Sequence, residues 1–267
     1  MKEKLKGYGR ACLPLLIKVR DFLMTPSAVM CILLLISAVA AKIEYDTTVA
    51  SDKLVPIYSV DRQDKRISLT IDAAWGNQYT KEIVDILDKY GVRITFFTVD
   101  FWANDYPDDI RMLKLAGHEI GNHSATHPDM AKLSREKMEQ ELLTTWETQK
   151  RLAGSSAVRL FRAPYGSYCN ELIEVCNQNG FEVIQWSVDS LDWKEGQTAD
   201  AVIERILDRT KAGSIILMHN NSDLITKVLP TVLEELIKQG YEFVPVSQLI
   251  YKNNFTIDAN GVQHTTK

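Results

Sequence analysis

The sequence predicts an α/β fold built on a parallel sheet, and two regularities carry this prediction. Short apolar runs of strand length alternate with longer amphipathic stretches of helical period along residues 58–252, which is the pattern that successive β–α units produce. Several of the helical stretches also stop close to a glycine, a residue that readily takes the left-handed conformation that ends a helix. The alternation alone fits either a doubly wound sheet or a sheet closed into a barrel.

The expected elements follow one another from residue 67 onwards. Strands are predicted at 67–72, 93–99, 118–121, 158–161, 182–188, 214–218 and 242–246. Helices are predicted at 80–90, 107–116, 134–152, 170–179, 198–211 and 222–239. The last residues, 253–267, are polar and are expected to form a frayed tail.

The first 41 residues have the composition of a membrane anchor. Residues 1–21 carry six basic and two acidic side chains, whereas 22–41 carry no charged side chain at all. A helix of twenty residues is about 30 Å long, which is the thickness of a bilayer core. Since the basic flank comes first, we expect a cytoplasmic tail over 1–21, a single transmembrane helix over 22–41, a linker over 42–57 and an extracytoplasmic domain over 58–252.

Two other interpretations of the apolar segment remain open. Ala38-Val39-Ala40 is an acceptable cleavage site for a signal peptide, and an apolar helix can also be buried in a protein core. The long basic region and the length of the apolar run favour a retained anchor over cleavage. A core helix normally has a polar face, and this segment has none.

The charge of the chain argues against nucleic-acid binding, and its cysteine spacing argues against a disulfide. The chain has a formal net charge of −4, of which the first 21 residues contribute +4, so the remainder carries −8. A domain this acidic binds nucleic acid or an anionic membrane surface poorly, so a neutral or small substrate is expected. Cys169 and Cys176 lie seven residues apart on one predicted helix, about 10 Å along its axis, which is too far for an unstrained disulfide.

Polar side chains gather at the carboxyl ends of the predicted strands. Asp72 ends the first strand, Arg162 follows the fourth and His219 follows the sixth. Asp189 and Asp192 follow the fifth. Active sites of parallel α/β proteins are built at this edge of the sheet. Each residue taken alone could also be structural, as a core histidine, an ion pair or a loop cap.

Two histidines provide a possible metal site. His123 and His127 are four residues apart, on one face of a helical turn and within reach of a single cation. This spacing also occurs by chance, so the pair alone does not establish a metal site. His118, beside Glu119 at the start of a strand, is expected to be a structural residue.

The order of these residues along the chain resembles the five motifs of the NodB-type polysaccharide deacetylases. The likeness extends over about residues 60–250, and five motifs in order make it specific. Residues 72–77 and 189–193 further resemble the sporulation-associated deacetylases of spore-forming bacteria. The five motifs are Thr70-Ile71-Asp72, His123-x-x-x-His127-Pro128, Arg162-x-Pro164-Tyr165, Asp189-x-x-Asp192-Trp193 and Leu217-x-His219.

The resemblance implies a distorted (β/α) barrel that holds a divalent metal, usually zinc, in an open groove. His123 and His127 would be metal ligands. The backbone N–H of Tyr165 would help to stabilise the oxyanion of the reaction. Trp193 and Leu217 would flank the methyl group of the acetyl.

The resemblance also implies a general base and a general acid. Asp72 would take a proton from water and would be held ionised by Arg162. His219 would protonate the departing amine, with Asp192 raising the basicity of its imidazole.

One departure from the family pattern concerns the metal. Members with the full pattern carry a second aspartate directly after the base, as the third ligand, and this chain has Ala73 there. Asp72, Asn77 or water would then have to complete the ligand set. Three outcomes stay open: an enzyme with a weaker or differently completed metal site, which is favoured, an enzyme without a conventional metal centre, or a degenerate protein that binds glycan without cutting it. Asn220 likewise stands where many members carry an acidic residue.

The leading prediction is therefore a membrane-anchored hydrolase that removes N-acetyl groups from peptidoglycan sugars. The rival prediction is a glycan-binding protein that keeps the fold without turnover. Deacetylation of chitin or of acetylated xylan uses the same residues and stays open within the enzyme class. A cell-wall polysaccharide and the membrane are the expected partners, no nucleic acid is expected, and a role in sporulation is implied by the resemblance only.

Overall fold

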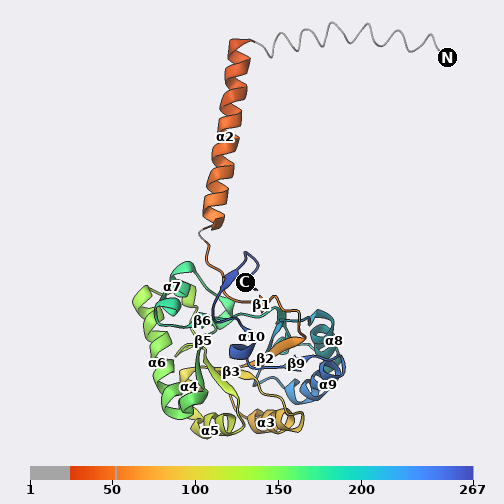
Figure 1. Cartoon of the computed structure of the whole chain (residues 1–267). Coiled ribbons are helices and arrows are strands. Elements are labelled where there is room, and N and C mark those ends of the chain that lie inside the picture. Colours follow the sequence, from red (N-terminus) through yellow and green to blue (C-terminus); the bar gives the residue numbers. More distant parts are fainter. Residues whose placement is uncertain (1–24, 52, 267) are drawn as a thin grey trace, which may run out of the picture. The chain divides into compact units, whose positions relative to one another are not determined.

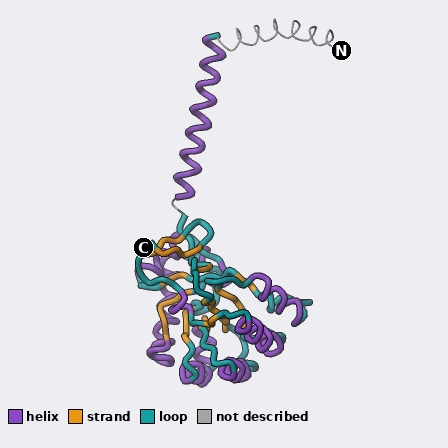
Figure 2. Tube along the Cα trace, turned by 45° about the vertical axis from the view of Figure 1, so that its right-hand side comes forward, coloured by secondary structure: helices purple, strands orange, loops and turns teal. Residues whose placement is uncertain are grey.

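The computed structural model describes residues 25–51 and 53–266. The chain divides into two compact units, Met1–Lys53 and Leu54–Lys267, whose elements are drawn in Figures 1 and 2. The expected cytoplasmic tail over 1–21 lies outside the described residues.

The first unit contains one long helix, α2 (Pro26–Ser51). It continues through ten residues that were expected to belong to a linker, because no glycine or proline after Pro26 interrupts it. No helix in the described part of the chain combines the length and the apolarity that a membrane crossing requires. The predicted transmembrane helix over 22–41 stays a prediction, and its first three residues lie outside the described part of the chain.

The second unit is built on a parallel sheet with the strand order β6-β5-β4-β3-β2-β8-β7, and β9 pairs with the start of β2. The polar residues at the strand ends therefore meet at one edge, as predicted. The strands are β2 (Arg66–Ala73), β3 (Thr95–Thr98), β4 (Glu119–Asn122), β5 (Ala157–Phe161), β6 (Glu182–Val183), β7 (Val188–Asp189), β8 (Ile215–His219) and β9 (Glu242–Phe243).

The sheet curls into an incomplete barrel. Strands β6 and β7 lie at its two ends, yet only residues 184–187 separate them in the chain. Ile57 lies beside this connection: its N–H donates to Val183 O (2.9 Å) and its carbonyl accepts from Gln185 N–H (2.8 Å). The distorted barrel is confirmed in this form, whereas the single strand predicted at 182–188 is wrong, because the chain there passes from one edge of the sheet to the other.

Helices surround the strands (Figures 1 and 2), and the six predicted between 80 and 239 are present within a few residues of their expected ends. Two short helices were not predicted, and α10 takes over a residue that was assigned to the strand at 242–246. The helices are α3 (Thr80–Lys89), α4 (Asp100–Asp105), α5 (Pro107–Leu115), α6 (Arg135–Ala153), α7 (Asn170–Gln178), α8 (Ala199–Arg209), α9 (Ile225–Lys238) and α10 (Val246–Leu249).

The alternation of side chains along β2 positions the polar edge. Ile67, Leu69 and Ile71 belong to the main hydrophobic core, since alternate residues of a strand face the same side. Thr70 lies on the other side, where its hydroxyl donates to Ile216 O (2.7 Å), and Asp72 continues this side at the strand end. A buried polar row therefore leads to the candidate base.

The C-terminal residues are not a frayed tail. Strands β10 (Phe255–Ile257) and β11 (Val262–Thr265) form an antiparallel pair, and β11 also pairs with β1 (Ser59–Val60) in a three-stranded sheet. Gln263 is fully buried, and its amide exchanges two hydrogen bonds of 2.8 Å with the backbone of Tyr251. Only Ile257 of β10 packs against a hydrophobic cluster, and strand pairing and polar contacts hold the rest of this segment, so the hydrophobic pattern did not predict it.

A glycine contact between β1 and β8 allows a test of the fold. Gly213 has a φ of +78°, and a Cβ there would lie 1.7 Å from Val60 O. Because both the conformation and the contact exclude a side chain, we expect Gly213→Ala to lower the free energy of unfolding by about 2–5 kcal/mol. Gly91 has a similar φ of +67° but open space around it, so Gly91→Ala is expected to cost only about 1–2 kcal/mol. Urea unfolding followed by circular dichroism measures both, and equal losses would contradict the prediction.

Candidate active site

Two of the predicted catalytic residues, Asp72 and His219, meet in one cavity at the carboxyl edge of the sheet. Asp72 and His219 are directly paired residues of the neighbouring strands β2 and β8, and Asp189 ends β7. Together with the loops after β4 and β5, these strand ends enclose a cavity of about 390 Å³. Its lining residues are Asp72, Ala74, Trp75, His123, His127, Tyr165, Trp186, Asp189, Trp193, Leu217, His219, Asn220 and Asn221.

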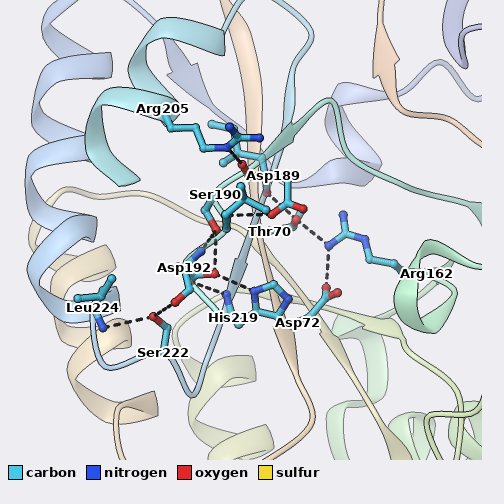
Figure 3. A network of polar contacts seen from close by, with 12 residues as sticks. Thr70, Asp72, Arg162, Asp189, Ser190, Asp192, Arg205, His219, Ser222 and Leu224 are labelled. Carbon is cyan, nitrogen blue, oxygen red and sulfur yellow. Dashed lines mark hydrogen bonds and ion pairs between the residues drawn. The ribbon is translucent and has the colours of Figure 1, made fainter. Parts of the chain in front are cut away.

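Arg162 holds Asp72 on one side of the cavity. Its fully buried guanidinium donates from Nη1 to Asp72 Oδ1 (2.7 Å) and to Thr70 Oγ1 (2.8 Å) (Figure 3). It also donates from Nη2 to Gln185 O (3.1 Å). The group also lies 4.1 Å from the centre of the Phe97 ring. These contacts fix the guanidinium, so it can orient the carboxylate beside it.

The charge of the Arg162 guanidinium also keeps Asp72 ionised. Burial by itself would raise the pKa of this carboxyl group, but the positive charge of Arg162 is the largest opposing effect, and the net pKa lies below its ordinary value. An ionised, oriented carboxylate at neutral pH is what a general base needs.

His219 and Asp192 form a second pair. The imidazole Nδ1 lies 2.8 Å from Asp192 Oδ1, and the backbone N–H of His219 donates to Asp192 Oδ2 (3.0 Å). Asp192 is in turn bonded by the hydroxyl of Ser190 (2.8 Å), and Figure 3 shows the imidazole lying between Asp192 and Asp72. Because Nδ1 faces the carboxylate, the other ring nitrogen of His219 remains for a ligand in the cavity.

The carboxylate also raises the proton affinity of this imidazole. Burial lowers the pKa of His219, but the hydrogen bond and charge of Asp192 outweigh it, and the net pKa lies above its ordinary value. His219 is therefore suited to hold a proton and donate it as a general acid.

The contact between His219 and Asp192 predicts a change in the pKa of His219 that can be measured without enzymatic turnover. In Asp192→Asn the two largest raising contributions are lost, while burial and the smaller raising charges of Asp72 and Asp189 remain, so the pKa of His219 is expected to fall. An NMR titration of the His219 ring measures this shift, with Asp208→Asn on the exposed face of α8 as a control that leaves it unchanged. If activity is detected, the alkaline limb of its pH profile should move to lower pH in Asp192→Asn, since the acid must be protonated. An unshifted ring titration would contradict the assignment.

His123 and His127 are brought together, with ring centres 5.0 Å apart. The predicted helical turn is wrong, because both lie in the loop after β4. His123 Nδ1 lies 2.8 Å from the carbonyl of Arg162, so it carries the proton, and Nε2 lies 3.4 Å from Asp72 Oδ2. His127 has a φ of +58° and lies between the rings of Trp75 (4.8 Å) and Tyr165 (4.7 Å). Burial lowers the pKa of both histidines, that of His127 to about 4, so both are neutral at pH 7.

The described residues do not complete the predicted zinc centre. They hold no group of three or more His, Cys, Asp or Glu side chains placed to bind a metal ion. A ligating histidine normally bonds a partner through its other ring nitrogen. His123 does so, but His127 Nδ1 is buried without a hydrogen-bond partner in the described chain. The donor set is one ligand short of the set that the resemblance implies, because Ala73 offers no ligand.

The three residues predicted to bind substrate lie at the cavity. Trp193, Leu217 and Tyr165 all line the cavity, and Tyr165 has a φ of +59°; their contacts with an acetyl group and an oxyanion stay predictions. His118 is the structural residue that was expected: its Nδ1 accepts the N–H of Ile94 (3.2 Å), and burial lowers its pKa to about 4.

Five lining residues were not predicted as part of the site. A signal existed for one of them, since Trp75 is a large apolar residue in the loop that directly follows the strand carrying the base. The others have no local sequence signal, because only the packing of the loops shows that they reach the cavity. The five are Ala74, Trp75, Trp186, Asn220 and Asn221.

Comparisons with known proteins identify the family of the chain. The model of the polysaccharide deacetylase family matches residues 59–184. A peptidoglycan-N-acetylglucosamine deacetylase of Bacillus cereus is 30% identical over 74% of this chain and 73% of its own. An uncharacterized 30.6 kDa protein of Geobacillus stearothermophilus is 31% identical over 76% of this chain and 78% of its own. The chain belongs to the polysaccharide deacetylase family.

Solved structures extend the comparison. A CE4-family pseudoenzyme from Bacillus anthracis aligns with a TM-score of 0.70 and 31% identity, over 79% of this chain and 72% of its own. A mutant of that protein with restored enzymatic activity aligns with a TM-score of 0.70 and 35% identity, over 73% of this chain and 71% of its own. The fold is therefore similar to that of a CE4-family pseudoenzyme and of its mutant with restored enzymatic activity.

Proposed function

We propose that the chain hydrolyses the N-acetyl groups of peptidoglycan sugars. One observation carries the proposal: Asp72 and His219 are directly opposite each other on neighbouring strands of one cavity. Each has its own charged partner, Arg162 for the carboxylate and Asp192 for the imidazole. A protein that only binds glycan has no need for two such opposed and separately supported pairs.

The pairs act on the two sides of one acetamide. Asp72 removes a proton from a water molecule as the water oxygen attacks the carbonyl carbon. His219 then gives its proton to the nitrogen as the C–N bond breaks, which leaves acetate and a free amine. The backbone N–H of Tyr165 is proposed to stabilise the oxyanion between these steps. We expect slow turnover, because the metal ligand set of the family is incomplete at Ala73.

The substrate is inferred from the relatives. Besides the Bacillus cereus protein, a peptidoglycan-N-acetylmuramic acid deacetylase of Bacillus subtilis is 27% identical over 77% of this chain. The proposal includes action outside the cytoplasm, where peptidoglycan lies, and a role in sporulation, for which the resemblance of 72–77 and 189–193 is the support.

A second candidate function is glycan binding without turnover. Two observations favour it: Ala73 replaces a metal ligand, and the Bacillus anthracis neighbour with 31% identity is a pseudoenzyme.

Release of acetate separates the two functions. The full-length chain is incubated with peptidoglycan and with chitin oligomers, in buffer, with added zinc and with a chelator. We expect slow release of acetate, greater from peptidoglycan. Binding of these glycans with no acetate above the buffer level under any of the three conditions would establish the second candidate instead.

A further inference from the structure

Exposed aromatic side chains occur at only one place in the described domain. Among the aromatic residues whose exposure is described, only Trp75, Tyr165 and Trp193 are exposed, at 52%, 71% and 60%. All three line the catalytic cavity, and they come from the loops after β2, β5 and β7. Large apolar rings are seldom left in water unless they meet a ligand, so their gathering at one cavity indicates a binding function.

Trp75 is held in place although half of its surface is exposed. Its ring lies against His127 with centres 4.8 Å apart, and it also contacts Phe101 at 6.3 Å. The loop beneath it is fixed at Gly76, whose carbonyl accepts from Trp102 Nε1 (2.7 Å). A ring ordered in this way loses little conformational entropy when a ligand stacks on it.

Asn220 anchors the same loop from β8. Its amide donates to the carbonyls of Gly76 (2.8 Å) and Trp75 (3.4 Å), and its backbone N–H donates to Asp72 O (3.1 Å). An acidic side chain at this position has no proton to donate to the two carbonyls and would repel them. The asparagine therefore explains how the loop that follows Ala73 keeps one conformation.

We propose that Trp75, positioned by Asn220, forms a sugar-binding subsite beside the acetyl position. Its ligand is the pyranose ring of an N-acetylhexosamine unit next to the one whose acetamide reaches Asp72 and His219. The apolar C–H face of a pyranose stacks on an aromatic ring, and polar groups around the cavity can bind its hydroxyls. This inference rests on the proposed glycan substrate and adds a second sugar unit to it.

Binding of chito-oligosaccharides to the full-length chain, measured by calorimetry, tests the subsite without requiring turnover. Trp75→Ala is expected to raise the Kd of chitotetraose about tenfold and to leave that of N-acetylglucosamine nearly unchanged, since the monomer fills only the acetyl position. Trp75→Phe should recover most of the affinity because it keeps a stacking ring. Leu115→Ala is the matched control, since Leu115 is 86% exposed on α5 and does not line the cavity.

The role of Asn220 is tested by a double-mutant cycle. Asn220→Asp is expected to weaken chitotetraose binding as Trp75→Ala does, and to have little further effect in the Trp75→Ala background, because both changes act through one ring. Additive effects would show that Asn220 does not position Trp75.

Different results would contradict the proposed subsite and the proposed function. Wild-type affinity in Trp75→Ala, or no binding of chitotetraose to the wild type, would overturn the subsite whether or not acetate is released. Length-dependent binding that requires Trp75, without any acetate release, would leave the subsite standing and remove the hydrolase.

Discussion

Asp72→Asn and His219→Ala are each expected to lower the rate of acetate release by about two to four orders of magnitude. Asparagine keeps the shape of Asp72 but cannot accept a proton from water. Alanine at position 219 removes the group that protonates the leaving nitrogen. The two residues face each other across paired strands, so each loss affects a different proton transfer of the same reaction.

The controls separate chemistry from stability. Asp85→Asn removes a carboxylate that makes an exposed ion pair with Lys81 on α3, and His264→Ala removes a half-exposed histidine of β11 outside the cavity. Both should retain wild-type rates. Asp72→Asn also leaves the buried Arg162 without its counter-charge, so its fold must be checked by thermal unfolding before a lost rate is assigned to catalysis. Rates unchanged in folded Asp72→Asn and His219→Ala would remove the proposed mechanism.

The fold could be predicted where local periodicity and global packing agree. The strand at 67–72 and the helix at 80–90 have their bounds almost as expected, at Arg66–Ala73 and Thr80–Lys89, because alternation and amphipathicity there are strong. The run at 182–188 looked like one strand because it is rich in β-branched and aromatic residues, which favour strands. That its halves belong to opposite edges depends on closure of the barrel, which no local pattern encodes.

The candidate site, like the fold, could be predicted from the sequence only in part. The order of the motifs identified Asp72, Arg162 and His219, because each is a polar residue at the end of an apolar strand. Asn220 was noted only as a departure from the family pattern. Its role depends on two backbone carbonyls in the loop at 75–76, and a contact between a side chain and a distant backbone leaves no mark in the sequence of either segment.

Ala73→Asp is expected to create zinc binding that the wild type shows only weakly. Position 73 follows Asp72 directly at the end of β2, where the resemblance places the third ligand. Ala73 is completely buried, so an aspartate there without a cation would cost about 3–5 kcal/mol of unfolding free energy. Zinc at 100 times its Kd should restore about 2.7 kcal/mol of this stability.

Ala103→Asp is the control that makes this result interpretable. Ala103 is also fully buried in the same hydrophobic core, but it lies on α4 and does not line the cavity. It should lose similar stability, and zinc should not restore it. Thermal unfolding and calorimetric titration of both variants with zinc measure the two effects.

The opposite result has a definite structural meaning. Ile67, Leu69 and Ile71 face the core that the helices cover, and strict alternation would point residue 73 the same way. If zinc stabilises Ala73→Asp no more than Ala103→Asp, the carboxylate faces that core and not the two histidines. The backbone at the end of β2 would then direct residue 73 away from the two histidines, in addition to the absence of a ligand on Ala73. A single substitution could not restore the centre, and Asp72 and His219 would have to act, if at all, without it.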